Sequence, residues 1–392
     1  MFCPRRKGKA PRPGARQPNF YKLSTLWRTL TEHLTSGIMN MFICSPDTRQ
    51  KGWGFVDKVT ALCQNRRVLF AATKQKSYLR NTQEMHLLAG IATQLTCAVS
   101  DSGRYPVRLV QVWAALIRHL FGQRYDTAFF GFAPQLMLPF LWLYRLRGTA
   151  VSIDFFISVY DTLVDDRKKF SPGGLPARLC HWLDHATLAA ADLVIVDTQA
   201  DRDFFCREFE CPAEKVQVLY LEADSAFYKP RPPRAPDGRF VVLYFGSALP
   251  LQGVEVILDA ARRLEEDPAV KFVLIGPFEK AFGVQPTCYP NVQFIPWLSQ
   301  PQLADAIAGA DLCLAGHFSG TIGKAARTIA GKTYIYRAME KPVVLGDGPA
   351  NRELFHPGNG VYFVPLGDGE ALARCIAQRR KEWSADGPEQ QP

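Results

Sequence analysis

Residues suited to binding an anion are concentrated between Gly316 and Asp347. The stretch opens with glycine, serine and threonine, which leave backbone N–H groups free to meet an anion. Three cations, Lys324, Arg327 and Lys332, then follow within nine residues. A glycine-rich turn that leads into a helix N-terminus is a ready phosphate site. The same pattern also suits a loop followed by a solvated basic helix face, so this stretch alone leaves both interpretations open.

Short apolar runs and helical patterns alternate around this stretch and must position it. From residue 66 onward, runs such as Val68–Ala72 and Leu193–Val196 are separated by segments with helical spacing. This alternation predicts βαβ units, and therefore parallel sheets with helices on both faces. Between Lys229 and Gly238, four prolines exclude a helix or a central strand and predict a linker. The expected fold class is α/β, with two doubly wound, Rossmann-like domains that face each other across a cleft and bind ligands at the carboxyl ends of their strands.

The predicted domain organisation follows from these boundaries. It comprises a disordered basic tail (1–22), an N-terminal extension of unclear structure (23–64), a first Rossmann-like domain on the acceptor side (65–228), a proline-rich linker (229–238), a second Rossmann-like domain for the nucleotide sugar (239–370), a C-terminal helix (371–383) and a disordered tail (384–392).

Charge is distributed unevenly along the chain. The net charge is +10, and the first 22 residues supply +7 of it with no acid, so the rest carries about +3. Such an arm suits anionic lipid, nucleic acid or simple solubility, and we favour the last. No run of eighteen apolar residues exists, and the ten cysteines lack CxxC or finger spacing, which favours reduced thiols in a cytoplasmic protein. His181 and His185 lie four apart on one predicted helix without a third ligand, so no metal site is expected.

Several ordered motifs resemble one known family. Gly320-x-x-x-Lys324-Ala-x-Arg327-x-Ile-x-x-Lys332-x-Tyr334, followed by Lys-Pro-Val-Val, is similar to a donor-domain motif of retaining glycosyltransferases of the GT-B fold, in the family-four-like group 1. Further blocks of this kind are Phe245-Gly-Ser-x-x-Pro-Leu-x-Gly-Val-Glu255, Val292-x-Phe-x-Pro-Trp297, Asp154-Phe-Phe-Ile-Ser-x-Tyr-Asp-Thr-Leu163 and Ala191-Asp-Leu-x-x-x-Asp-Thr198. The resemblance covers about residues 66–383.

The resemblance implies a chemistry and a set of site residues. A sugar would leave a nucleoside diphosphate with retention of its anomeric configuration, without a metal or other cofactor. Cationic side chains and helix-terminal amides would stabilise the departing diphosphate. Lys324 and Arg327 are the candidates for this role, and Asp154 would position the sugar or the acceptor hydroxyl unless it is a turn or cap residue. The other donor-binding candidates are Gly246, Ser247, Gly276, Ile295, Trp297, Thr321, Lys332 and Glu353, the last of which could instead cap a helix.

Two departures from the family pattern bear on activity. Ile335 stands where many members have a ribose-contacting glutamate, and Gln252 stands where the first donor loop often has a cation. The expected function is transfer of a sugar from a nucleotide-sugar donor to a saccharide or lipid-linked acceptor in envelope or polysaccharide synthesis. The alternative is a catalytically degenerate GT-B module that binds a nucleotide sugar or a partner protein. A sugar-nucleotide epimerase is disfavoured by the Asp154–Leu163 block, and no nucleic-acid partner is expected.

A contact with a membrane is a further hypothesis from the sequence. The predicted helices at 107–121 and 134–147 combine apolar faces with several arginines, as in helices that lie on an anionic membrane. The protein would then be cytoplasmic and peripheral at the inner face of the membrane. Apolar residues all round 134–143 also suit a buried helix, so both interpretations stay open.

Overall fold

A computed structural model of the chain describes residues 58–232, 238–283 and 288–385. These residues belong to one compact unit that spans residues 46–392. The predictions for the basic tail, most of the N-terminal extension and the end of the C-terminal tail lie outside the described residues. Among the helices of the described ranges, none is long and apolar enough to span a membrane.

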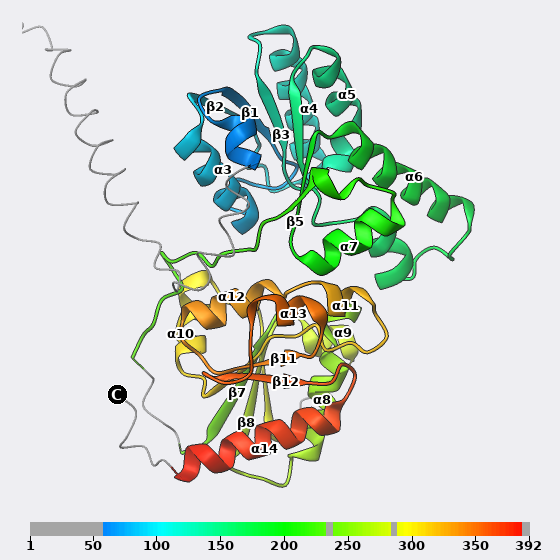
Figure 1. Cartoon of the computed structure of the whole chain (residues 1–392). Coiled ribbons are helices and arrows are strands. Elements are labelled where there is room, and N and C mark those ends of the chain that lie inside the picture. Colours follow the sequence, from blue (N-terminus) through cyan, green and yellow to red (C-terminus); the bar gives the residue numbers. More distant parts are fainter. Residues whose placement is uncertain (1–57, 233–237, 284–287, 386–392) are drawn as a thin grey trace, which may run out of the picture. The chain divides into compact units, whose positions relative to one another are not determined.

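The described chain contains two six-stranded parallel sheets, here called the first and second sheets (Figure 1). The first has the order β2-β1-β3-β4-β5-β6. Its strands are β1 (Arg67–Ala71), β2 (Gln94–Ala98), β3 (Thr127–Phe130), β4 (Ala150–Asp154), β5 (Leu193–Val196) and β6 (Val216–Val218). The second has the order β12-β11-β10-β7-β8-β9. Its strands are β7 (Phe240–Phe245), β8 (Val270–Ile275), β9 (Val292–Ile295), β10 (Leu312–Leu314), β11 (Val343–Gly346) and β12 (Val361–Val364). The two parallel α/β sheets confirm the predicted fold class.

Helices cover both faces of the first sheet. A helical segment at residues 58–63 and α3 (Leu79–Ile91) pack with Val68, Phe70 and Phe129 in one core. The opposite face packs against four helices, which are α4 (Tyr105–Phe121), α5 (Leu138–Leu146), α6 (Leu175–Ala190) and α7 (Gln199–Glu208). Strands β3 and β5 are buried along their whole length, as expected of a parallel sheet covered on two sides.

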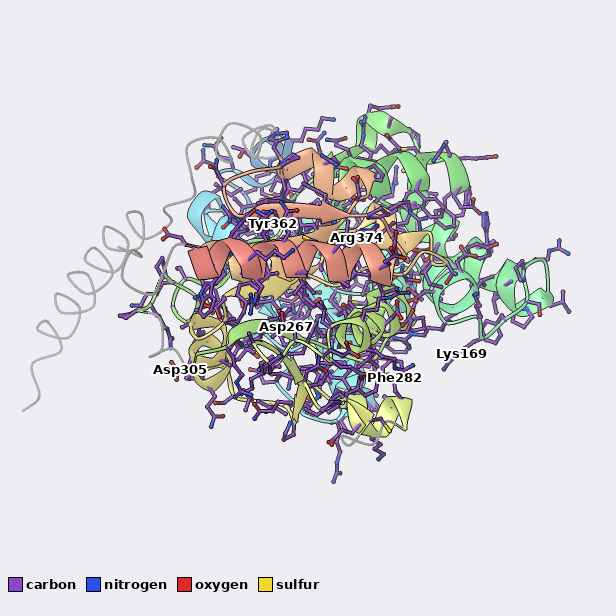
Figure 2. All side chains as sticks on the ribbon, turned by 90° about the horizontal axis from the view of Figure 1, so that it is seen from below. Lys169, Asp267, Phe282, Asp305, Tyr362 and Arg374 are labelled. Atoms are coloured by element: carbon purple, nitrogen blue, oxygen red, sulfur yellow. The ribbon has the colours of Figure 1, made fainter. Side chains whose placement is uncertain are left out.

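The second sheet is covered in the same way, by two separate cores. One core contains α8 (Val254–Arg263) and α14 (Gly369–Ala385), and the other contains α10 (Gln300–Ala308) and α12 (Gly331–Ala338). Figure 2 shows α14 lying along this lobe beside Tyr362, whose ring faces the Arg379 guanidinium. The remaining short elements are η1 (Pro134–Met137), η2 (Asp161–Asp166), η3 (Ala213–Lys215), η4 (Pro250–Gln252), α9 (Phe278–Phe282), α11 (Lys324–Arg327) and α13 (Pro349–Leu354).

The helix predicted from Lys324 to Met339 is two helices. The short α11 ends at Arg327, and Thr328 is extended, with φ −113° and ψ 140°. The Thr328 hydroxyl donates to the Lys324 carbonyl oxygen at 2.6 Å, which satisfies an acceptor that a continuing helix would use. The prediction of one helix was therefore wrong, and Lys332 lies near the start of the second helix, α12.

Each sheet has one position where the strand order reverses. In the first sheet this switch point lies between β1 and β3, and in the second it lies between β7 and β10. Loops at such points diverge to opposite sides of the sheet and leave a crevice at the carboxyl ends of the strands. The switch points are therefore where ligand-binding residues are expected.

Candidate functional site

Two glycine loops meet at the switch point of the second sheet. Gly246 follows β7, and Gly316 follows β10 with a φ of 76° that favours glycine. A Cβ at Gly316 would lie 2.6 Å from Gln252 Oε1 and 3.2 Å from Lys332 Nζ. One at Gly246 would lie 3.3 Å from Lys332 Cε. Only a residue without a side chain fits at either position.

The side chain that both loops surround is Lys332, near the start of α12. It is 8% exposed, and its Nζ donates to Gln252 Oε1 at 2.7 Å and lies 5.1 Å from the centre of the Tyr244 ring. Within the described residues no carboxylate pairs with it, so burial lowers its pKa to about 7. From the sequence, a lysine on this helix could also pair with Glu340 or Asp347, but neither ion pair forms among the described residues, and Asp347 pairs with Arg352. A buried cation without a counter-ion is suited to receive an anion.

Gln252 takes a role that the sequence did not suggest. Its Oε1 accepts from both Lys332 Nζ and the Tyr244 hydroxyl, at 2.7 and 3.0 Å. Its backbone carbonyl accepts from Phe318 N at 3.2 Å and so joins the two loops. The positive charge that this loop lacks in the sequence is supplied from α12, because Gln252 holds Lys332 in place.

His317 lies in the same loop with a fixed protonation state. Its side chain is 7% exposed, and burial together with the charge of Lys332 lowers its pKa to about 3. Nδ1 lies 3.1 Å from the carbonyl oxygen of Thr328, which can only accept a hydrogen bond. The neutral imidazole therefore carries its proton on Nδ1, which leaves Nε2 as an acceptor for a hydroxyl group.

Lys324 and Arg327, the predicted diphosphate ligands, face acidic residues of the first lobe (residues 58–232). Arg327 Nη2 lies 2.8 Å from Asp161 Oδ1, and its Nε lies 3.5 Å from Asp201. Lys324 Nζ lies 3.5 Å from Asp161. The Arg327 guanidinium also stacks on Phe204, 3.7 Å from the ring centre. Burial raises the pKa of Asp201 to about 8, against the opposing effect of Lys324 and Arg327. The two cations thus have counter-ions, whereas no carboxylate of the described residues pairs with Lys332.

A pocket of about 490 Å³ adjoins this ion-pair cluster. Arg327, Thr321 and Gly323 line it from the second lobe (residues 238–385), while Asp161, Asp165 and Lys168 are among those that line it from the first. Thr321 is exposed, and its Oγ1 lies 3.4 Å from Ser319 Oγ. The structure therefore brings Thr321, Lys324 and Arg327 together at one end of the site.

Asp154, the predicted catalytic carboxylate, is part of a buried charge network in the first lobe. Both of its oxygens accept from Arg80, at 3.0 and 2.9 Å, and its side chain is fully buried. Glu84 lies 3.5 Å from the same guanidinium, and burial raises its pKa well above the usual value. Asp154 is thus paired with Arg80, whereas Lys324 and Arg327 are paired with Asp161.

Asp197 completes this network at its exposed end. It follows β5 directly and lies 3.5 Å from Arg80 Nη2, with its side chain 22% exposed. Burial raises its pKa to about 6, against the opposing effects of Arg80 and Lys324. A carboxyl group that titrates near neutral pH is suited to exchange a proton with a ligand hydroxyl.

The remaining predicted donor-site residues occupy three places. Glu353 caps helix α7, since its carboxylate accepts from the backbone N–H groups of Gln199 and Ala200, both at 2.8 Å, and from the Tyr220 hydroxyl. Ile295 is half-buried at the end of β9, and Trp297 is exposed just beyond it. Ser247, which is half-buried, and Gly276, which is buried, follow β7 and β8, so they lie at the same sheet edge as Lys332.

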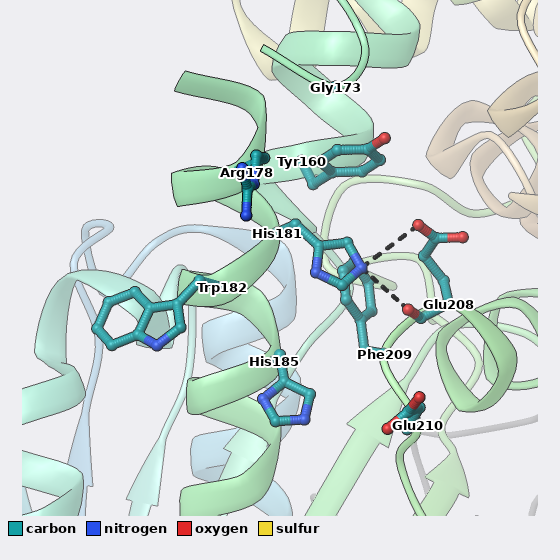
Figure 3. A pocket seen from close by; sticks show the side chains of 9 residues that line it. All are labelled: Tyr160, Gly173, Arg178, His181, Trp182, His185, Glu208, Phe209 and Glu210. Atoms are coloured by element: carbon teal, nitrogen blue, oxygen red, sulfur yellow. Dashed lines mark hydrogen bonds and ion pairs between the residues drawn. The ribbon is translucent and has the colours of Figure 1, made fainter. Parts of the chain in front are cut away.

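A second pocket, of about 430 Å³, lies on the first lobe beside α6 (Figure 3). His181 and His185 line it, and His181 Nε2 lies 3.0 Å from the Glu208 carbonyl oxygen and 3.5 Å from its carboxylate. In the described part of the chain, no group of His, Cys, Asp and Glu side chains is arranged to hold a metal ion.

Several residues of the site were not found from the sequence. Arg80 and Glu84 lie in a predicted helix in which neither residue was singled out, and Asp161 was assigned to a loop on the rim of the cleft. Arg80 and Asp154 are 74 residues apart, so no local spacing could have paired them. The alternation of strands offered one signal, because Asp154 and Asp197 both end strands at the same edge of the sheet.

Comparisons with known proteins agree with this architecture. The family model described as glycosyl transferases group 1 matches residues 239–380. The Anabaena HepE structure in complex with UDP is 17% identical, with a TM-score of 0.55 over 81% of this chain and 90% of that one. Sucrose-phosphate synthase from Thermosynechococcus elongatus is 14% identical, with a TM-score of 0.59 over 80% and 89%. The lipopolysaccharide outer core galactosyltransferase WaaB, in its apo form, is 13% identical, with a TM-score of 0.51 over 81% and 90%.

No curated protein matches the sequence. At these low identities the structural neighbours establish the fold. The chain has the GT-B fold, and its second lobe matches glycosyl transferases group 1, as the motifs predicted.

Proposed function

We propose that this protein is a retaining glycosyltransferase that uses a nucleoside-diphosphate sugar as donor and a saccharide or lipid-linked acceptor, in envelope or polysaccharide synthesis. The observation that carries the proposal is the buried, uncompensated charge of Lys332 at the switch point of the second sheet. A diphosphate would supply the missing counter-charge at the carboxyl ends of β7 and β10. The HepE neighbour was solved with UDP, and the family match covers the same lobe.

In this proposal the diphosphate binds beside Lys332, at the sheet edge from which the loops at Gly246 and Gly316 extend. Trp297 is exposed just beyond β9, at the same sheet edge, and in this proposal it contacts the nucleotide base. Lys324 and Arg327 add charge at the leaving phosphate when the donor competes with Asp161 for them. Retention of configuration and independence from metal come from the family resemblance alone.

The sugar and the acceptor are assigned to the polar groups around the diphosphate. Nε2 of neutral His317 accepts from a sugar hydroxyl, because its Nδ1 proton is held by Thr328. Asp197 accepts from the acceptor hydroxyl, since its pKa of about 6 leaves it ionised at neutral pH. Asp154 positions Asp197 through Arg80, to which both carboxylates bind.

A catalytically degenerate, nucleotide-sugar-binding module is the second candidate, and one observation favours it. Ile335 packs in the core of the second lobe at 9% exposure, where many family members carry a ribose-contacting glutamate. Glu353 cannot replace that residue without giving up the cap of α7. A degenerate module binds the donor but transfers no sugar.

A thermal-shift screen tests the proposal. UDP, GDP, ADP, dTDP and their common sugar conjugates are added to the full chain, where a ligand at a hundred times its Kd stabilises the fold by about 2.7 kcal/mol. We expect one nucleotide to raise Tm in the wild type and not in Lys332→Gln. Lys381→Gln, on the exposed side of α14, is the matched control and keeps the shift.

The screen also separates the two candidates. A donor that binds is then incubated with acceptor extracts, and release of free nucleoside diphosphate is measured. Binding with release supports the enzyme, and binding without release under all acceptor conditions supports the degenerate module. Absence of a shift with every nucleotide would contradict both.

A further inference from the structure

The outer surface of α4, α5 and α6 exposes an unusual amount of apolar side chain. Fifteen large hydrophobic residues are exposed in the described chain, and most of them lie on these three helices or at their ends. Four of the most exposed are Val110 at 65%, Phe121 at 79%, Leu146 at 84% and Leu175 at 79%. The others on this surface, here called the α4–α6 face, are Tyr105, Val107, Trp113, Ile117, Trp142, Leu143, Leu179 and Trp182.

Helix α4 is apolar on two sides. Val112, Leu116 and Leu120 form its buried stripe against the sheet. Val110, Trp113, Ile117 and Phe121 recur at a spacing of three and four, which places them in a second stripe on the solvent side. A surface helix of a soluble protein normally carries polar residues there. Apart from Trp113, which contacts Leu136 and Phe140 of the neighbouring segment, we assign this second stripe no packing role within the described residues.

The three helices form one continuous layer. The Tyr144 hydroxyl of α5 donates to the Leu116 carbonyl of α4 at 2.9 Å, and Trp113 Nε1 donates to the Leu136 carbonyl at 3.0 Å. Arg145 of α5 donates to the Ala190 carbonyl of α6 at 3.0 Å. In Figure 1 the three helices lie on the same side of the first sheet. Their exposed residues thus belong to a single surface rather than to isolated positions.

The charge on this layer has one sign. Helices α4 and α5 contain no acidic residue, and the one acid of α6, Asp184, is buried and accepts from Ser158 and Gln135. Arg118, Arg147 and Arg178 are exposed on or directly beside the apolar residues. Arg145 is also exposed but faces Asp192 at 3.4 Å. An apolar surface whose three helices expose arginines and no acidic residue of their own complements an anionic lipid surface.

We propose that the α4–α6 face docks on the surface of an anionic lipid bilayer. Phe121, Leu146 and the tryptophans enter the region between headgroups and acyl chains, and the arginines meet lipid phosphates. The sequence predicted membrane contact for α4 and α5, and it left a buried helix as the alternative interpretation of α5. The exposed residues of α5 and the addition of α6 decide for a surface role. The proposal does not depend on the transferase activity, because it rests on a different face and different residues.

Vesicle flotation of the full chain tests this docking. The probe is a set of vesicles made of equal parts phosphatidylglycerol and phosphatidylcholine, compared with phosphatidylcholine alone. We expect the wild type to float with the anionic vesicles, and Phe121→Ser with Leu146→Ser to reduce the bound fraction at least about tenfold, since each side chain loses apolar burial. Arg118→Glu with Arg147→Glu should also abolish flotation at low salt.

Control variants distinguish docking through this face from binding through the basic tail or through any exposed apolar residue. Phe282→Ser removes an exposed apolar residue of α9, labelled in Figure 2, and should float as the wild type does. Replacement of Arg5, Arg6 and Lys7 by glutamine tests the basic tail. Loss of flotation in the tail variant with normal flotation of both face variants overturns the proposal. A wild type that stays at the bottom, or a face that proves by light scattering to join two copies of the chain, also overturns it.

Discussion

Buried cationic side chains lie at the switch points of both sheets, but only the cation at the first switch point is paired with carboxylates. At the first, Arg80 is paired with Asp154, Glu84 and Asp197. These side chains pack closely against the end of β3, since a Cβ at Gly131 would lie 3.0 Å from Glu84 Oε2. At the second, Lys332 has the amide oxygen of Gln252 and no carboxylate among the described residues. A complete network stabilises the fold, whereas an incomplete one leaves a site for a ligand of opposite charge.

The first lobe should therefore depend on its buried cation for stability. Arg80→Met leaves three carboxylates around one buried position without their counter-ion. We expect the free energy of unfolding to fall by about 3–5 kcal/mol, measured by urea denaturation. Arg118→Met, at an exposed position of α4, is the control and should change it by less than about 0.5 kcal/mol. An effect of Arg80→Met as small as that of the control would show that the network is not buried as described.

The second lobe should respond in the opposite way. Lys332→Met removes an uncompensated buried cation and keeps an unbranched side chain of similar length. The free energy of unfolding should stay the same or rise, because a charged group is no longer desolvated. The variant should no longer bind the nucleoside diphosphate. It should therefore lose the stabilisation of about 2.7 kcal/mol that the wild type gains at a hundred times the Kd. Destabilisation of the free protein comparable to that of Arg80→Met would contradict the contrast between the two switch points.

Asp161 offers a smaller test of how the two regions interact. Asp161→Asn frees Arg327 and Lys324 from a buried carboxylate that competes with the donor. We expect the affinity for nucleoside diphosphate to rise several-fold, roughly 1 kcal/mol, by isothermal titration calorimetry. Asp165→Asn, an exposed acid that lines the same pocket, should leave the affinity unchanged. A lower affinity in Asp161→Asn would mean that Asp161 orients the two cations for the donor instead of competing with it.

Much of the fold follows from local patterns that the sequence displays. Runs such as Val68–Ala72 and Leu193–Val196 are apolar throughout because both faces of a parallel sheet are covered, and they are strands in the structure. Glycines after β7 and β10 marked the loops of the second switch point. These features depend on neighbours in the chain, so residue types and spacing suffice to predict them.

The site depends on contacts between distant parts of the chain, which the sequence could not specify. The sequence left Lys332 either as a donor-binding residue or as a partner of Glu340 or Asp347, and in the structure its side chain contacts Gln252, 80 residues away. Glu353 caps α7 across 154 positions, although its sequence context suggested ribose or a local cap. Arg327 and Lys324 were assigned to phosphate from the glycine-rich loop and the family resemblance, and local patterns could not show that Asp161 lies beside both of them.

Proton uptake on binding of a nucleoside diphosphate tests the central claim most directly. With a pKa of about 7 in the free protein, Lys332 is mostly neutral at pH 8, and a bound diphosphate raises its pKa by favouring the charged form. Calorimetry with UDP, or whichever diphosphate the screen identifies, at pH 8 in HEPES and in Tris buffer should show uptake of about 0.9 proton. The affinity should accordingly fall as pH rises above 7.

Lys332→Arg keeps a charge that does not titrate, so it should bind without proton uptake and without this dependence on pH. Binding by the wild type with no proton uptake, or the same uptake in Lys332→Arg, would contradict the assignment of Lys332 as the diphosphate ligand.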